Sequence, residues 1–323
     1  MYVIETARPG GPEELKLVID SIPMPSSKQV RIKIAAAGVN RGDIKQREGH
    51  HPPPAGASTV LGLEASGIID AIGSDVTGWQ IGDEVCALLP GGGYAEYVVV
   101  EQELVLPVPS GVNIVEAGGI VETCATVWSN LFQTERPVEG SWLLIHGGGS
   151  GIGITAIQMG VALGYRVAVT VGSEWKAEKC LDLGAEIAIN YKETDFVEVL
   201  QERGVKVARV LDHVGGSYIN KDIAVLEIEG QILSIASLEG ADAVVNLPAL
   251  TKVRGNLRAS SLRARSLESK AEILSQLEAF VWPLFESGKM KPVTYERFPL
   301  GAAAHAHKIL ESSEHFGKVL LVP

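Results

Sequence analysis

Residues 142–153 read Trp142-Leu-Leu-Ile-His-Gly-Gly-Gly-Ser-Gly-Ile-Gly153, and this stretch decides the fold. An apolar run typical of a buried strand leads into a glycine-dense turn, which a helical pattern follows. Such a turn lets backbone N–H groups at a helix N-terminus approach a pyrophosphate, where the helix dipole also favours negative charge. Counted from Gly148, the G-x-G-x-x-G positions are Gly148, Ser150 and Gly153, so serine replaces the middle glycine. Alone, the turn is an incomplete dinucleotide-binding motif.

Strand and helix patterns alternate after the turn. Ile154, Ile157 and Val161 form the apolar stripe of a helix that should end at Gly164. A second helix is expected from Glu174 to Leu183. The predicted strands are 166–171, 187–190, 207–212 and 231–236. This alternation predicts an α/β fold with a parallel sheet and right-handed crossovers.

The sequence before the turn has a different pattern. Val30, Ile32 and Ile34 alternate with charged residues, as in a half-buried strand, and short glycine-punctuated apolar runs follow. A helix from Leu267 to Ser287 and a strand at 319–322 are expected near the other end. We therefore expect a β-rich domain from residues 1–121 and a dinucleotide-binding domain from 122–261.

Composition narrows the class of protein. A chain of 323 residues with 46% hydrophobic and 21% charged residues is typical of a soluble two-domain protein. The net charge of −11 argues against a nucleic-acid binder, and no stretch resembles a signal peptide or a membrane span. Cys86, Cys124 and Cys180 are dispersed, which indicates a reduced compartment and favours a cytoplasmic location.

The end of the second predicted strand indicates which dinucleotide binds. An acidic residue there would bind a ribose 2′-hydroxyl, but this chain has Gly172 and Ser173, with Lys176 shortly after. A hydroxyl and an ammonium favour a 2′-phosphate, so the pattern predicts NADPH. Glu174 weakens the argument unless it points to solvent. The alternative for Lys176 is a solvated helix residue.

Several motifs occur together in a recognisable order. They are Gly38-Val-Asn-Arg-Gly-Asp43, Leu61-Gly-Leu-Glu-Ala-Ser-Gly67, Ile81-Gly-Asp-Glu-Val85, Leu89-Pro-Gly-Gly-Gly-Tyr-Ala-Glu-Tyr97, the glycine turn and His315-Phe-Gly-Lys-Val319. In this order the chain resembles the medium-chain dehydrogenase/reductase superfamily, and within it the zinc-free quinone oxidoreductase branch that includes zeta-crystallin. The resemblance implies a GroES-like catalytic domain, formed by residues 1–121 and completed by 262–323, around an inserted Rossmann domain with a doubly wound parallel sheet.

Metal ligands of the zinc-dependent relatives are missing here. Those enzymes have cysteine at the position of Asn40 and histidine at that of Leu63, and three scattered cysteines cannot form a structural zinc site. No metal is therefore expected. Adjacent His50 and His51 point apart on a strand, which disfavours a metal there too.

The resemblance implies a role for one histidine, whereas helix spacing places two others on different faces of a helix. His51 takes the place of a tyrosine that lines the substrate pocket of close relatives, so we expect a pocket role for it. His305 and His307, in a predicted helix, are expected at the solvated surface.

The same resemblance implies the remaining site residues. Asn40 and Thr126 should lie near the nicotinamide, although Asn40 could instead be a turn residue. The pyrophosphate should meet the turn at Gly148, Ser150, Gly151, Ile152 and Gly153. The 2′-phosphate side should be formed by Gly172, Ser173, Lys176 and Tyr191, with Lys318 completing it. Tyr191 could instead be a core or adenine-stacking aromatic.

Three functions stay open at this stage. The first is an NADPH-dependent quinone reductase, in which the cofactor supplies the hydride and the protein positions the acceptor, with one-electron and hydride transfer undistinguished. The second is an NADPH-dependent reductase of the C=C bond of a 2-alkenal or enone. The third is an NADPH-binding structural or interaction protein. The resemblance also implies a small-molecule quinone or activated carbonyl substrate and a homodimer, with no nucleic acid or membrane as partner.

Overall fold

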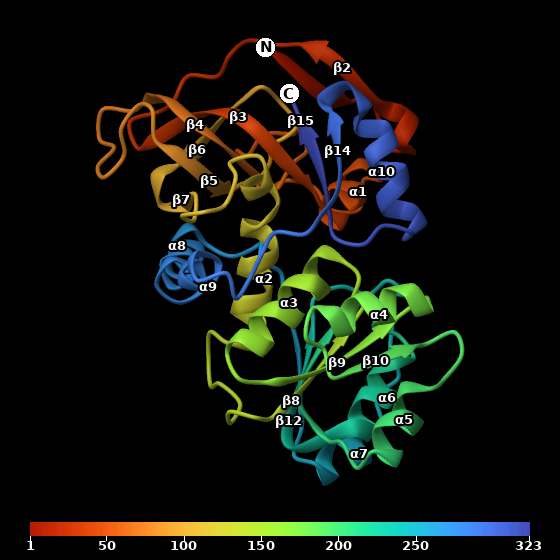
Figure 1. Cartoon of the computed structure of the whole chain (residues 1–323). Helices are drawn as coiled ribbons and strands as arrows, with labels where there is room; N and C mark the ends of the chain where they lie inside the picture. The colour runs from red at the N-terminus through yellow and green to blue at the C-terminus, as the bar shows by residue number, and fades with distance from the viewer. The chain divides into compact units, whose positions relative to one another are not determined.

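The computed structural model describes residues 1–323, and the chain divides into two compact units (Figure 1). Unit 1 contains Met1–Ala125 and Arg263–Pro323, and unit 2 contains Thr126–Leu262. The first boundary falls inside helix α2 (Val121–Leu131), and the second follows strand β13 (Asn256–Ala259). The sequence places these boundaries at 121/122 and 261/262.

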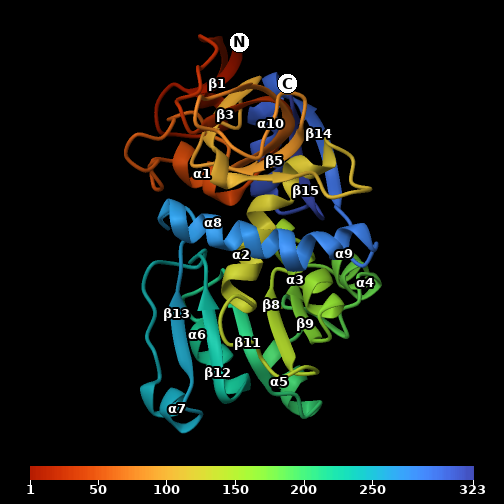
Figure 2. The same cartoon turned by 90° about the vertical axis from the view of Figure 1, so that its left-hand side faces the viewer.

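Unit 2 is built on a sheet of six parallel strands in the order β10-β9-β8-β11-β12-β13. Numbered along the unit, this order is 3-2-1-4-5-6, that of the classic dinucleotide-binding fold. Figure 2 shows β13, β12, β11, β8 and β9 side by side. The strands are β8 (Trp142–His146), β9 (Arg166–Val171), β10 (Ile187–Asn190), β11 (Val207–Asp212), β12 (Leu226–Ser234) and β13.

Buried apolar runs explain why these strands pair in parallel. Every residue of β11 is buried, as are four of the five residues of β8, because helices cover the sheet. The core includes Leu144, Phe196 and Ile223. The helices are α3 (Gly151–Ala162), α4 (Glu174–Asp182), α5 (Phe196–Glu202), α6 (Tyr218–Val225) and α7 (Leu247–Lys252).

The predicted elements of unit 2 are largely confirmed. The strands 166–171, 187–190 and 207–212 match to the residue, whereas the strand predicted at 231–236 begins at Leu226 and ends at Ser234. Gly164, at φ +86°, follows the end of α3, as expected for a residue that leaves a helix in the left-handed conformation.

Unit 1 is built on a second sheet of seven strands in the order β14-β15-β3-β4-β5-β7, with β6 paired to β3. The long strand β3 (Gln29–Val39) pairs antiparallel with three neighbours, and only β14 and β15 run parallel to each other. The other strands are β4 (Glu64–Ile72), β5 (Glu84–Leu88), β6 (Tyr97–Glu101), β7 (Val105–Pro107), β14 (Thr294–Pro299) and β15 (Lys318–Val322), while β1 (Tyr2–Thr6) and β2 (Leu15–Ile19) form a separate pair.

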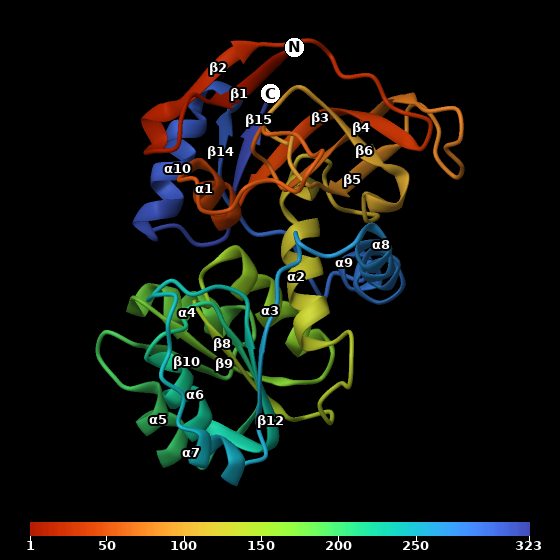
Figure 3. The same cartoon turned by 180° about the vertical axis from the view of Figure 1, so that it is seen from behind.

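Few helices belong to unit 1. Helix α1 (Arg41–Arg47) follows β3 directly, and α10 (Ala303–Ser312) lies alongside β14 (Figure 3). The helix predicted from Leu267 to Ser287 is present as α8 (Leu267–Gln276) and α9 (Trp282–Glu286), joined by a π-helical turn, η4 (Leu277–Val281). Pro283 has no N–H to donate to the turn before it, which accounts for the irregularity. The 3₁₀ turns are η1 (Pro12–Glu14), η2 (Gln102–Leu104), η3 (Glu116–Gly119) and η5 (Leu300–Ala302).

The α/β fold class predicted from the sequence is confirmed: unit 1 is β-rich, and unit 2 has the doubly wound parallel sheet of the Rossmann type. None of the helices combines the length and the apolar character that crossing a membrane requires.

Candidate active site

The glycine turn joins the carboxyl end of β8 to the start of α3. A Cβ atom on Gly153 would stand 2.3 Å from the carbonyl oxygen of Gly147, so this crossing of backbone on backbone requires glycine. Ser150 is the N-cap residue, and its Oγ accepts from the backbone N–H of Gly153 at 3.0 Å. That bond uses the hydroxyl as an acceptor, so its proton can be donated to a ligand. The predicted residues Gly148, Gly151 and Ile152 lie in the same turn, where the first N–H groups of a helix have no intrahelical partner.

A second polar group lies at the carboxyl ends of β9 and β10. A Cβ atom on Gly172 would come within 2.7 Å of the Tyr191 hydroxyl, so Gly172 allows that hydroxyl to lie against the backbone. Ser173 Oγ is buried and has no hydrogen-bond partner in the structure, although Ser173 is the N-cap of α4. An orphaned buried hydroxyl at a helix N-terminus suits an anionic ligand.

The side chains around that hydroxyl bear on the open alternatives. Lys176 is half-buried in the first turn of α4, and Glu174 is exposed, as its predicted orientation to solvent requires. Tyr191 is 48% exposed, which excludes the core alternative for this ring. The structure therefore brings Gly172, Ser173 and Tyr191 together.

Beneath the turn lies a buried pair that sequence reasoning missed. His146, the last residue of β8, is bonded through Nε2 to Asp222 Oδ1 at 2.8 Å and through Nδ1 to Thr170 Oγ1 at 3.0 Å. Asp212, at the end of β11, accepts from the backbone N–H groups of Val214 and Gly215. Burial raises the pKa of Asp222 to about 6. The histidine directly before the glycines was the sequence signal for this pair, because the last residue of the strand that leads into the turn is buried at that edge of the sheet.

These three groups are also the one place where potential metal-binding atoms converge. One ligand atom each of His146, Asp212 and Asp222 lies within 4.8 Å of the others, and all three side chains are buried. Because hydrogen bonds already join His146 to Asp222 and Asp212 to the backbone, we assign these residues to holding the turn and the loop after β11.

The centre of unit 1 is a buried ion pair. Lys318 Nζ, on β15, donates to Glu64 Oε1 and to Asn40 Oδ1, both at 2.7 Å, and to the carbonyl of Val39 at 3.2 Å. Glu64 Oε1 also accepts from Asn40 Nδ2 at 2.9 Å, and Glu64 Oε2 accepts from the N–H of Glu122. Glu64 is fully buried.

This arrangement bears on two predicted roles. All three N–H groups of Lys318 have acceptors inside unit 1, so we leave Lys318 out of the proposed 2′-phosphate site. Asn40 occupies the N-cap position of α1, as the turn alternative expected, and its amide is held by Glu64 and Lys318. Its place near the nicotinamide stays a prediction.

A chain of buried hydrogen bonds continues from Asn40. Asp43 accepts from the N–H of Asn40 at 2.8 Å and from the Tyr94 hydroxyl at 3.2 Å. Tyr94 in turn lies 3.0 Å from His307 Nε2, and Arg47 donates to His307 Nδ1 at 3.2 Å. Because arginine can only donate, His307 carries its proton on Nε2 and donates to Tyr94. Burial, with Arg47 adding to it, lowers the pKa of His307 to about 3, so the ring is neutral.

The expectation of a solvated His307 was therefore wrong, although His305 is exposed as expected. The two differ because α10 turns the face that bears His307 toward Arg47 of α1 and toward Tyr94 in the segment before β6.

The other predicted residues lie separately. His51 is half-buried in a loop of unit 1, where burial and the charge of Arg263 lower its pKa. The His50 side chain is 71% exposed and lies 3.8 Å from Glu48. Thr126 is buried in α2 at the start of unit 2, and its carbonyl accepts from Asn130 Nδ2 at 2.8 Å. The predictions for His51 and Thr126 stay predictions.

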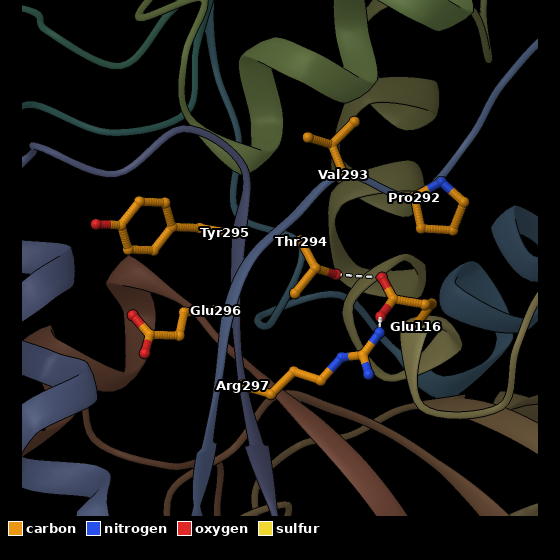
Figure 4. A pocket seen from close by; sticks show the side chains of 7 residues that line it. All are labelled: Glu116, Pro292, Val293, Thr294, Tyr295, Glu296 and Arg297. Carbon is orange, nitrogen blue, oxygen red and sulfur yellow. Dashed lines mark hydrogen bonds and ion pairs between the residues drawn. The ribbon is translucent and has the colours of Figure 1, made fainter.

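A surface hollow of about 600 Å³ in unit 1 contains none of these residues (Figure 4). Both carboxylate oxygens of Glu116 are engaged there, one by the Thr294 hydroxyl and one by Arg297. With its carboxylate already paired, the hollow is not a candidate active site.

Comparisons with known proteins agree with this architecture. Residues 26–110 match the alcohol dehydrogenase GroES-like domain, and residues 183–321 match the zinc-binding dehydrogenase family. The chain is 32% identical to quinone oxidoreductase 1 of Escherichia coli (strain K12) over 99% of both sequences. A crystal structure of E. coli quinone oxidoreductase complexed with NADPH covers 100% of both chains at 32% identity, with a TM-score of 0.89. A crystal structure of an NAD-dependent alcohol dehydrogenase reaches the same TM-score at 29% identity, again over 100% of both chains.

The two units and the glycine turn define a dinucleotide-dependent oxidoreductase. The chain belongs to the medium-chain dehydrogenase/reductase superfamily, as its motifs predicted.

Proposed function

We propose that this chain is a quinone reductase that takes its electrons from NADPH and works without zinc. The observation that carries the proposal is the end of β9, where Gly172 takes the place of the acidic residue that selects NADH and the orphaned Ser173 hydroxyl follows it. A carboxylate there would repel a 2′-phosphate, whereas a hydroxyl can donate to it. The E. coli relative crystallised with NADPH supports the same choice.

The residues of unit 2 would bind the cofactor in two places. The first turn of α3, with the hydroxyl of Ser150, would hold the pyrophosphate. Ser173, Lys176 and Tyr191 would hold the 2′-phosphate and its ribose. When bound, NADPH supplies a hydride to the acceptor, so the protein needs to position the acceptor and exclude water rather than supply a strong acid.

The donor set in unit 1 supports zinc independence. Asn40 and Leu63 stand where zinc-dependent relatives have ligands, and neither suits zinc. Glu64 is already neutralised by the ammonium of Lys318 at 2.7 Å. The charge that a metal would supply beside Glu64 is thus supplied by the chain itself.

NADPH oxidation by the purified, chelator-treated protein tests the proposal. We expect turnover with 9,10-phenanthrenequinone that added zinc does not increase. Failure with every quinone tested would refute quinone reduction. Turnover with a 2-alkenal instead would establish C=C reduction, and tight NADPH binding without turnover on either acceptor would establish a structural or interaction protein.

Lys176→Ala tests the cofactor assignment separately. Because a charge-assisted hydrogen bond contributes about 1.5–3 kcal/mol, we expect the preference for NADPH over NADH in kcat/KM to fall about tenfold to a hundredfold. Lys179→Ala is the matched control, since Lys179 is an exposed lysine of the same helix that lies 3.7 Å from Asp182. An unchanged preference in Lys176→Ala would remove Lys176 from the site.

A cytoplasmic homodimer is part of the same proposal, on the resemblance alone. Light scattering of the purified protein should then give twice the chain mass of 34.3 kDa.

A further inference from the structure

The segment of residues 48–60, here called the acceptor loop, has little to hold its own shape. It joins α1 to the approach of β4 without any helix or strand, and it contains Pro52, Pro53 and Pro54 in a row. Prolines have no N–H, so this part of the loop cannot donate backbone hydrogen bonds. Two hydrogen bonds form within its second half: the N–H of Ala57 donates to the carbonyl of Pro54, and the N–H of Val60 donates to Ser58 Oγ. The proline run therefore contributes no backbone donors of its own to hold the loop.

Arg263 supplies a donor directly before the prolines. It is the first residue of unit 1 after unit 2, and it is 8% exposed. Its Nη1 donates to the carbonyl of His51 at 3.0 Å, directly before the prolines. Nε and Nη2 both donate to the carbonyl of Pro90, at 3.1 and 2.7 Å. One guanidinium thus joins the acceptor loop to the segment that begins the Gly91-Gly92-Gly93 run.

Gln46 extends this attachment to the far end of the loop. Its Oε1 accepts from Arg263 Nη2 at 2.7 Å, and its Nε2 donates to the carbonyl of Thr59 at 2.9 Å. The acceptor loop is therefore held near both of its ends, at His51 directly and at Thr59 through Gln46.

The hydrogen bonds of Arg263 are those of a residue that holds a loop in place and differ from those of a salt bridge. All four of its hydrogen bonds go to uncharged oxygens. The planar guanidinium holds several acceptors in a fixed geometry, which a flexible ammonium with three donors does less well. Burial, with the charge of Arg263 adding to it, also lowers the pKa of His51.

We propose that Arg263 is the positioning residue that holds the acceptor loop, and with it His51, in the conformation that binds the electron acceptor. The inference rests on the proposed function, because it takes the pocket role of His51 as given. A loop released from Arg263 spends part of its time in other conformations, and the apparent affinity for the acceptor falls by that fraction. NADPH, bound by unit 2, does not share this loss.

Arg263→Met tests the proposal, because methionine keeps much of the apolar stem and removes the donors. We expect the KM for 9,10-phenanthrenequinone to rise about tenfold or more, with kcat and the Kd for NADPH changed by less than about twofold. Arg263→Lys should recover part of the loss. Arg8→Met, at a surface arginine of unit 1 whose side chain is 79% exposed, is the matched control and should behave as the wild type.

Hydrogen exchange of the acceptor loop provides a readout that needs no activity. The amides of residues 55–60 should exchange about tenfold faster in Arg263→Met than in the wild type, so the loop can be judged even if the wild type reduces no quinone. Wild-type KM and exchange in Arg263→Met would overturn the proposal. A fall in kcat and in NADPH affinity alongside the rise in KM would overturn it too, because that combination indicates general damage to the structure.

Gln46→Met keeps the proposal testable if Arg263→Met does not fold. It should raise the KM severalfold and speed exchange at Thr59 and Val60, because Gln46 links Arg263 to that end of the loop. An unchanged KM and exchange in that variant would then overturn the proposal.

Discussion

Lys318→Met should strongly destabilise unit 1. The substitution removes the ammonium 2.7 Å from Glu64 Oε1 and leaves a carboxylate whose side chain is 1% exposed. Breaking a buried pair by removing one partner costs about 3–5 kcal/mol. Glu64 keeps its bonds from Asn40 Nδ2 and the N–H of Glu122, so we expect the lower end, about 3 kcal/mol.

Glu64→Gln should cost a similar amount, because it strands the ammonium instead. In the double variant neither charge remains, and the Asn40 amide can turn over to accept from the new amide at position 64. We expect the double variant to lose at least about 2 kcal/mol less than the sum of the two single losses.

Scanning calorimetry is the suitable assay, since two units need not unfold as one two-state system. For a unit of this size, about 3 kcal/mol lowers the Tm by about 6–12 °C. Lys308→Met, at an exposed lysine of α10, is the control and should leave the Tm unchanged. A Tm of Lys318→Met within about a degree of the wild type, or additive losses in the double variant, would refute the reasoning.

Three further substitutions test other parts of the structure. Gly153→Ala places a Cβ 2.3 Å from Gly147 O and should weaken NADPH binding by about tenfold or more in a fluorescence titration, whereas Gly301→Ala, with its nearest contact at 3.5 Å, should not. Asp222→Asn should remove a dependence of stability on pH. Burial raises the pKa of the folded Asp222 carboxyl to about 6, above its unfolded value near 3.9, so between these values the folded wild type binds a proton that the unfolded chain does not. The wild type therefore loses on the order of 3 kcal/mol of stability as the pH rises from 4 through 6. The Tm of Asp222→Asn should lack that fall, and a variant less stable than the wild type at pH 7 would contradict the argument. Tyr94→Phe leaves the proton on His307 Nε2 without an acceptor and should cost about 1–3 kcal/mol in chemical unfolding, while Tyr2→Phe, at a half-exposed ring, should cost little.

The sequence was most informative where local patterns decide structure. The strands at 166–171, 187–190 and 207–212 were predicted to the residue because each is a short apolar run bounded by turn residues. The glycine turn and the polar end of β9 could be located for the same reason, since all their residues lie within one strand–turn–helix unit.

Such local patterns could not predict contacts between residues that lie far apart in the sequence. Lys318 and Asn40 are 278 positions apart, and Arg47 and His307 are 260 apart, so nothing near either residue indicates the other. His307 was assigned to the surface from its spacing to His305, but the face that a helix buries depends on what packs against it. His146 was missed because its partners, Thr170 and Asp222, come from elements later in the chain.

The buried pair in unit 1 has a consequence for the order in which the protein matures. During synthesis the chain emerges from its N-terminus, and domains generally fold as units. Asn40 and Glu64 are made early, then all of unit 2, and the cation that neutralises Glu64 arrives afterwards with β15. Until then the Glu64 carboxylate has no counter-charge, and burying it unpaired is unfavourable, which opposes early folding of unit 1 around it. Unit 2 can therefore mature first, while unit 1 stays open until Lys318 has been synthesised.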